Sequence, residues 1–301
     1  MKIYFNKIFR VIKNATKGWN DKDPFRQSAV IAYYAIFSLP GLLVVIITLA
    51  GYFFGREEVN NRILEQFSST MGTNTAEQVQ NIITQASEAK KTVFATIIGV
   101  ATILFGATGM FAQFQKSLNI IWEVEPDTSK SGILTLLKVR LFSFGLIVSI
   151  AFLLIISLVV SALLAAFGNW VSAQFSDAFL VVLKILNFLV SFLILTVLFA
   201  LMFKFLPDAK IKWQHVWVGS LITAFLFVLG KSGLGFYFGK AEPGTGYGAA
   251  GSIILIMLWV SYSSMIVFYG AELTRAYADL TTGKVPPSDI GKKREPSTQD
   301  E

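Results

Sequence analysis

The chain has 301 residues, of which 54% are hydrophobic and only 15% are charged, and its mean hydropathy is +0.60. A soluble domain carries about 25% charged residues, so this composition argues against a water-soluble globular protein. The 27 Phe residues and the long apolar runs exclude a disordered chain. Because there is no Cys and one His, disulfides, thiolate metal sites, a cysteine nucleophile and a multi-histidine metal site are excluded as well.

The first 28 residues form a basic arm that is predicted to be an amphipathic helix. Its apolar side chains between Tyr4 and Ala15 follow helical spacing, with lysines on the opposite side. Lys7, Arg10 and Lys13 interrupt the apolar residues, so the arm is not a cleavable signal peptide. We expect it to lie on the inner leaflet with its lysines toward anionic headgroups. The alternative is a basic arm surrounded by water.

Six segments are long and apolar enough to cross a bilayer, since about 20 helical residues span the hydrocarbon core. A spanning segment must satisfy its own backbone hydrogen bonds, which makes each one a helix. The sequence therefore predicts an all-α polytopic membrane protein with six transmembrane helices and short amphipathic helices on both faces. The expected transmembrane domain covers residues 29–280, and its spans are about 29–54, 93–111, 141–167, 178–203, 216–238 and 249–271.

The first span contains a group of polar residues beside a predicted kink. Pro40 removes a backbone hydrogen bond and the next residue is glycine, so the helix is expected to bend there. Tyr33, Tyr34 and Ser38 lie on the cytoplasmic side of the kink and are candidates for lining a cavity. The alternative is that the tyrosines belong to an interfacial aromatic belt.

Residues 56–91 are polar and are expected to form a helical cap on the outer face. Two sets of apolar residues each share one helical face, with a turn at 71–74 between them. The sets are Val59, Ile63 and Phe67 in the first helix and Val79, Ile82, Ile83 and Ala86 in the second.

The helical period of the second span continues into the cytoplasm until Pro126 is expected to stop it. Gln113, Lys116 and Asn119 lie on this polar extension and are further candidates for lining a substrate path. In the fourth span, Lys184 lies about 9 Å of helix inside the membrane. It is either an outer-leaflet anchor that extends toward water or a cation on the path.

Eight glycines lie between residues 230 and 251, at the outer end of the fifth span. Such density predicts a broken helix and close backbone approach, because glycine is costly in a helix interior. One interpretation is a gate or substrate cradle that includes Lys231, Tyr247 and Gly248. The alternative is close helix packing through small residues, followed by an ordinary loop.

The last span carries Trp259, Tyr262 and several serines at mid-depth, which either line a cavity or hold helices together. Glu272 follows at the inner end, three residues before Arg275, a spacing at which the two can pair along one helix face. Glu272 is a candidate path residue, for which a structural pair or a helix-end anchor is favoured over a proton relay. From residue 281 onward the chain is polar and contains prolines, and a disordered cytoplasmic tail is expected over 281–301.

The distribution of Lys and Arg predicts the orientation. With six spans, 19 of the 26 Lys and Arg residues lie on the side of the two termini and six on the other side, with Lys184 inside a span. The positive-inside rule then places both termini in the cytoplasm. The formal net charge of +7 is explained in this way without a nucleic-acid partner.

Enzyme chemistry has little support in the sequence. The cytoplasmic acids, including Glu123, Glu125 and Asp127, are scattered and follow no metal-ligand pattern. His215 lies at the entrance of the fifth span, where an interfacial role is favoured over a general base. We therefore predict no catalytic residue, no metal and no cofactor.

Three stretches nevertheless resemble a known family: residues 29–39, residues 105–122, and residues 247–251 continuing through Trp259 to 269–273. They resemble the YihY/BrkB family of inner-membrane proteins from about residue 20 to 280, although relatives often place the proline of the first span one position later. The resemblance implies a protein of the bacterial inner membrane with six transmembrane helices and both termini in the cytoplasm. It also implies a function connected with the cell envelope, with some relatives linked to export of lipids or lipopolysaccharide precursors. The label ribonuclease BN attached to this family is regarded as a misassignment.

The leading hypothesis is a protein that transports or flips an amphiphilic, anionic lipid or envelope precursor. It rests on polar and glycine-rich helix segments without an ion relay at mid-membrane, with Lys184 and Lys231 toward the outer face. Lys116 would gather anionic headgroups inside. The alternatives are a scaffold for envelope integrity and, third, a membrane-bound ribonuclease. Membrane lipids are the expected partners, nucleic acid is not, and a homo-oligomer is left open.

Overall fold

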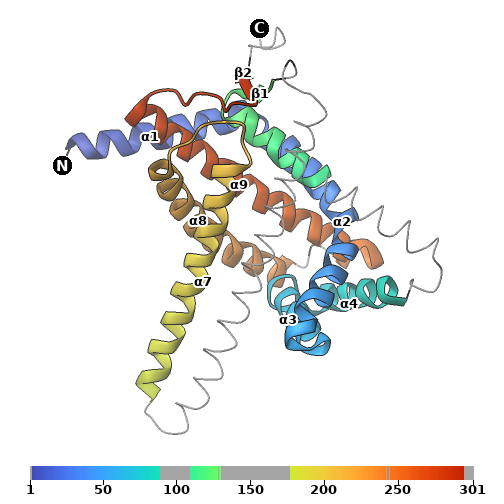
Figure 1. The fold of residues 1–301 in the computed structure, drawn as a ribbon. Helices are drawn as coiled ribbons and strands as arrows, with labels where there is room; N and C mark the ends of the chain where they lie inside the picture. The colour runs from blue at the N-terminus through green and yellow to red at the C-terminus, as the bar shows by residue number, and fades with distance from the viewer. Residues whose placement is uncertain are drawn as a thin grey trace. The chain divides into compact units, whose positions relative to one another are not determined.

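The computed structural model describes residues 2–88, 109–127, 129, 177–241, 243 and 245–294. They fall into two compact units. The first unit draws on residues 1–15, 118–225 and 270–301, and the second unit on residues 16–117 and 226–269. The described chain is mostly helical (Figure 1), as the sequence predicts.

Four helices in the described part of the chain are long and apolar enough to cross a membrane. These spans are Pro24–Tyr52, Val181–Phe205, Trp213–Ala241 and Gly251–Thr282, and they correspond to the first, fourth, fifth and sixth expected spans. The expected spans 93–111 and 141–167 lie outside the described residues, except for the helical residues 109–111. The count of six therefore stays a prediction.

The N-terminal arm is divided between two helices, α1 (Lys2–Asp21) and α2 (Pro24–Phe54). Asp23 separates them in a left-handed conformation with φ of 48°, and its carboxylate accepts a hydrogen bond from the Arg26 backbone N–H at 3.4 Å. A second hydrogen bond, from the Arg26 side chain, lowers the pKa of the Asp23 carboxyl below its ordinary value. Pro40 lies inside α2, which is one continuous helix, and the expected kink stays a prediction.

Helices α3 (Arg56–Met71) and α4 (Thr73–Glu88) occupy the range of the expected helical cap. Gly55 and Gly72 connect α2 to α3 and α3 to α4 with φ of 87° and 89°, which glycine adopts without steric cost. The two helices pack against each other and against α2 (Figure 1). Of the expected apolar faces, Val59, Val79 and Ile83 are buried, while Ile63, Phe67 and Ile82 are half-buried. The Ala86 side chain is outside the described set.

Helix α7 (Asp177–Phe205) is followed by α8 (Trp213–Ala241), a 3-10 helix η3 (Thr245–Ala250) and α9 (Gly251–Thr282). The expected break among the glycines is wrong up to residue 241, because α8 continues through four of them. A glycine costs only about 1 kcal/mol in a helix, and the internal hydrogen bonds of a long apolar helix outweigh this cost.

The polar extension of the second span is a helix over residues 109–121, which ends earlier than Pro126. Glu123 adopts a left-handed conformation with φ of 54° and redirects the chain. The next residues form strand β1 (Val124–Pro126). The expectation that Pro126 stops the helix is therefore wrong, because the helix has already ended at the turn before it.

The tail also differs from the expectation of disorder over residues 284–294. Strand β2 (Gly291–Lys293) pairs antiparallel with β1, and the backbone N–H of Ser288 donates to the Asp208 carbonyl at 2.8 Å. Two prolines at 286–287 restrict the unfolded chain, which lowers the entropic cost of ordering this segment. Residues 295–301 lie outside the described residues.

Candidate functional site

The candidate residues on α2 contact their own helix and a neighbouring glycine. Tyr33 is 55% exposed, and its ring lies 5.7 Å from that of Tyr34. A Cβ atom on Gly109 would lie 2.5 Å from Tyr34, so backbone and ring are in close contact. Ser38 is buried, and its hydroxyl donates to the Ala35 carbonyl at 3.0 Å. This bond engages the Ser38 hydroxyl within its own helix, and a place for Ser38 in a cavity stays a prediction.

The candidates on α9 lie against α2 and α8 within the second unit. The Trp259 ring packs edge-on against Phe227 of α8, with ring centroids 6.3 Å apart. Tyr262 lies beside Gly230, where a Cβ atom would come within 3.0 Å of its ring. Ser261 shares a hydrogen bond of 3.0 Å with Ser28 of α2. These polar residues join helices, as one of the two interpretations proposes.

The remaining candidates near the glycine-rich stretch are exposed or stand on the 3-10 helix. Lys231 is exposed on α8, and Tyr247 is 61% exposed on η3. Gly248 also belongs to η3. Lys184 is exposed on α7 in the first unit. Their proposed place on a substrate path stays a prediction.

The candidates on helix 109–121 have three different environments. Gln113 is half-buried and donates to the Ser117 hydroxyl at 3.4 Å, whereas Lys116 is exposed. Asn119 is buried and makes two hydrogen bonds with Asp208, in the loop between α7 and α8: its amide donates to the carboxylate at 2.7 Å, and its carbonyl accepts from the backbone N–H at 2.8 Å. Asn119 is therefore a structural contact in the first unit.

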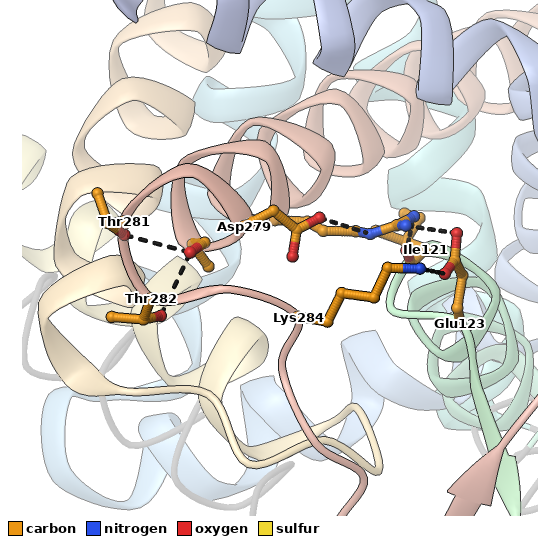
Figure 2. A network of polar contacts seen from close by, with 8 residues as sticks. Ile121, Glu123, Asp279, Thr281, Thr282 and Lys284 are labelled. Atoms are coloured by element: carbon orange, nitrogen blue, oxygen red, sulfur yellow. Dashed lines mark hydrogen bonds and ion pairs between the residues drawn. The ribbon is translucent and has the colours of Figure 1, made fainter.

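Arg275 is the centre of a charged cluster that the sequence did not reveal. Its guanidinium donates to the Ile121 carbonyl at 2.7 Å, to the Glu123 carboxylate and, at 3.6 Å, pairs with Asp279. Lys284 reaches the other oxygen of Glu123 at 3.9 Å (Figure 2). The planar guanidinium thus caps the end of helix 109–121 and ties it to α9.

The ion pair predicted between Glu272 and Arg275 stays a prediction. Glu272 is 3% exposed, and the carboxylates seen to pair with Arg275 are those of Glu123 and Asp279. Residue Asp279 lies four positions after Arg275, which is an equally favourable helical spacing. The sequence pattern could not choose between the two carboxylates.

Beside this cluster lies a pocket of about 210 Å³. It is smaller than the roughly 300–1,000 Å³ of pockets that enclose drug-sized ligands, so it fits a headgroup-sized fragment. Three cationic and two anionic side chains line it, which leaves one net positive charge. The lining residues are Trp122, Glu123, Val124, Arg275, Asp279, Lys284, Val285, Pro286, Pro287 and Lys293.

Two features favour an oxygen-rich anion in this pocket. Lysine and arginine side chains form charge-assisted hydrogen bonds with carboxylate and phosphate oxygens. Trp122 is 4% exposed, and among the described residues its indole N–H has no hydrogen-bond partner. A buried donor without a partner is costly, so a small movement toward a bound acceptor would be favourable.

A tight contact between α8 and α9 lies in the same unit. A Cβ atom on Gly219 would lie 1.7 Å from the Thr274 hydroxyl, and one on Gly270 would lie 1.9 Å from the Thr223 hydroxyl. Each threonine also donates at 2.7 Å to the carbonyl of the glycine four residues before it. The two helices therefore interlock through reciprocal Gly-x-x-x-Thr segments, as small residues permit within membranes.

Sequence reasoning missed both the charged cluster and this interlock. The only available signals were the repeated Gly-x-x-x-Thr spacing and the charges that follow an otherwise apolar helix at Glu272, Arg275 and Asp279. Within the described ranges, no three His, Cys, Asp or Glu side chains are grouped so as to hold a metal ion.

Comparison with known proteins gives a consistent picture. Residues 15–292 match the model of the family described as Virulence factor BrkB. The chain is 27% identical over 250 residues to a "UPF0761 membrane protein" of Pseudoalteromonas atlantica, covering 81% of this chain and 78% of the relative. It is 25% identical to a "UPF0761 membrane protein" of Aggregatibacter aphrophilus, covering 89% and 91%.

Another relative carries a different name. The "Putative ribonuclease-like protein YfkH" of Bacillus subtilis is 25% identical over 254 residues, covering 82% of this chain and 87% of the relative. No solved structure matches the chain.

Proposed function

The chain belongs to the virulence factor BrkB family and is a membrane protein, and from this premise we propose that it transports or flips an amphiphilic, anionic lipid or envelope precursor across the bacterial inner membrane. The observation that carries the proposal is the positively charged, headgroup-sized pocket beside Arg275. An amphiphile needs a polar site for its headgroup and an apolar environment for its tail, and the pocket offers the first of these.

The position of the pocket along α9 supports the proposal. Helix α9 has 32 residues and is therefore about 48 Å long, whereas the hydrocarbon core is about 30 Å thick. Glu272, Arg275 and Asp279 lie in its last three turns, so the pocket is at the part of α9 that projects into the headgroup region or beyond it.

Contacts within the second unit support the placement of both termini in the cytoplasm. Trp19 donates to the Met265 carbonyl at 3.2 Å, while Ser28, nine residues later, contacts Ser261, four residues before Met265. The part of α9 from Ser261 to Met265 thus runs antiparallel to the chain from Trp19 to Ser28, as expected if the chain enters α2 and leaves α9 on one side of the membrane. The segments before α2 and after the apolar part of α9 also carry most of the Lys and Arg that the positive-inside rule places in the cytoplasm.

We also propose that the chain is not an enzyme. The acids that a ribonuclease would need are engaged elsewhere: Glu123 with Arg275, Glu125 with Lys292 at 3.0 Å, and Asp127 with the Ser129 hydroxyl at 2.6 Å. Metal-dependent RNA cleavage by the purified protein, lost in Glu123→Gln, would contradict this part of the proposal.

The second candidate function is a scaffold that transports nothing. It is favoured by the hydroxyl groups of Ser38, Ser264 and Thr274, which donate to carbonyls of their own helices and leave no donor for a substrate. In a scaffold, the glycines serve helix packing alone.

Proteoliposomes that contain a fluorescent anionic or zwitterionic lipid distinguish the two functions. A membrane-impermeant reductant then measures how fast the probe changes leaflet. We expect the protein to speed the movement of the anionic probe between leaflets. Lys293→Gln, in the pocket lining, should slow this movement several-fold. Lys292→Gln is the matched control, because Lys292 is the neighbouring cation and does not line the pocket.

The outcome that overturns transport is a probe rate equal to that of protein-free vesicles over an extended panel of anionic lipids and precursors. Loss of the acceleration in both lysine variants would instead show that surface charge, and not the pocket, selects the lipid.

A further inference from the structure

Helix α1 has an exposed apolar strip along part of its length. Ile8, Phe9 and Ile12 are 59%, 60% and 46% exposed. Ile8 and Ile12 are one helical turn apart, and Phe9 lies beside them, so the three side chains form one surface. We propose that this strip inserts into the headgroup boundary of an anionic bilayer surface and holds α1 flat on the membrane.

The strip is distinct from the part of α1 that packs against protein. Ala15 is fully buried, and Val11 and Trp19 are partly buried, on the edge of the helix next to the strip. The protein thus covers one edge of the apolar face and leaves the other edge open.

The opposite face of the helix carries the charge that selects the partner. At about 100° per residue, four cations fall on the side away from the strip. They are Lys7, Arg10, Lys13 and Lys17, all of them exposed. The stretch from Lys7 to Lys17 contains no acidic residue. An apolar face opposite a polar face that carries cations and no acidic residue is typical of helices that lie in the interface of an anionic leaflet.

Aromatic contacts at the end of α1 support a location at the membrane surface. The Trp19 ring packs edge-on against Tyr269 at 6.0 Å, and the Tyr269 hydroxyl contacts the Thr16 hydroxyl at 3.1 Å. Trp and Tyr rings are enriched at the membrane–water interface. Helix α2 begins at Pro24, directly after this aromatic group, so α1 precedes the first span without a long connection.

Spin labels on the full-length protein test this inference, and the chain has no Cys to remove. Labels at Phe9→Cys and Ile12→Cys report on the strip, and a label at exposed Asn14→Cys reports on the opposite face. The protein is placed in nanodiscs of phosphatidylcholine alone or mixed with phosphatidylglycerol. A water-soluble relaxation reagent and molecular oxygen then measure exposure to water and to lipid.

We expect the labels at 9 and 12 to be several-fold less accessible to the water-soluble reagent than the label at 14, and more accessible to oxygen. The difference should grow with phosphatidylglycerol. It should shrink when Lys7, Lys13 and Lys17 are changed together to Gln, while the thermal midpoint stays unchanged. The lipid-transport assay does not enter this test, so the two proposals fail independently.

Two results would overturn the inference. Equal accessibility at 9, 12 and 14 in both nanodiscs would mean that water surrounds the strip. Protection at 9 and 12 that persists in detergent and ignores lipid charge would mean that protein covers the strip, either another segment or a second copy of the chain.

Discussion

Two pairs of glycines in this chain have opposite surroundings. At Gly219 and Gly270, a Cβ atom would lie within 2 Å of a threonine hydroxyl on the neighbouring helix. At Gly233 and Gly239, no neighbouring atom of the described residues outside the adjoining helix backbone lies within 4 Å of where a Cβ atom would be. The first pair consists of isolated glycines, whereas the second pair belongs to the stretch where glycines are dense.

The difference shows that glycine density does not mark the tightest helix contact. Close approach requires a small residue on one helix opposite a specific side chain on the other, and one glycine is enough for that. Within the dense stretch of α8, Gly230 lies against Ile266 and Tyr262, whereas Gly233 and Gly239 have no such neighbour among the described residues. The following predictions test this contrast, from the largest expected effect to the smallest.

Gly219→Ala and Gly270→Ala are expected to lower the free energy of unfolding by about 3 kcal/mol each, because the added methyl group collides with a buried threonine. Denaturant unfolding in mixed micelles measures the change. Thr274→Ala combined with Gly219→Ala should recover part of the loss, since it removes the colliding hydroxyl. Additive losses in the double variant would mean that the two residues are not in contact.

Arg275→Met is expected to lower the free energy of unfolding by about 2 kcal/mol, because three acceptors lose a charged hydrogen-bond donor. The Glu123 side chain is 43% exposed, and water screens its charge, so the loss of stability is not expected to be larger. Arg275→Lys should recover little, since one ammonium cannot reproduce the fork of the guanidinium. Lys292→Met, which breaks the more exposed pair with Glu125, is the control and should change stability by less than about 1 kcal/mol.

Gly291→Ala is expected to release the tail, because a Cβ atom there would lie 2.6 Å from the Asp208 carbonyl oxygen. The Lys-Lys-Arg sequence at 292–294 provides tryptic sites directly beyond this glycine. Trypsin should cleave there several-fold faster in the variant than in the original protein. Equal and rapid cleavage in both would restore the expectation of a disordered tail.

Gly233→Ala should change the stability of the protein in the opposite direction to Gly219→Ala. In the part of the chain that the structure describes, the added methyl group meets no neighbouring side chain, and alanine favours a helix over glycine by up to about 1 kcal/mol. We expect a slight rise in the thermal midpoint with unchanged lipid transport. A fall comparable to that of Gly219→Ala would remove the contrast between the two glycine pairs.

The smallest effect is expected at Asp23, which adopts a left-handed conformation without being glycine. Its hydrogen bonds with Arg26 lower the pKa of its carboxyl, so its contribution to stability is complete above the ordinary value of 3.8 and is lost as the pH falls through the lower value in the folded protein. In Asp23→Asn, the thermal midpoint should therefore fall slightly less steeply than in the original protein as the pH is lowered into the acid range. Comparison of the two proteins between neutral and strongly acidic pH measures this.

The sequence predicted features that depend on neighbouring residues. Helical periodicity gave α1, α3 and α4, and hydropathy located four spans that the structure describes. It could not predict contacts between distant residues, such as Arg275 with Glu123, 152 positions apart. The spacing of three residues indicated only Glu272 as a partner of Arg275. The ordered tail was missed for the same reason, because its hydrogen-bond partners lie in β1 and beside Asp208.

The central claim is that α1, the charged pocket and both chain ends lie on the cytoplasmic face. Single cysteines at Asn14, at Asn61 in α3 and after Glu301 test it with a membrane-impermeant maleimide added to intact spheroplasts. We predict that the cysteine at 61 reacts at once and that the other two react only after the membrane is permeabilised. Reaction of Asn14→Cys and the C-terminal cysteine from opposite sides would contradict the account.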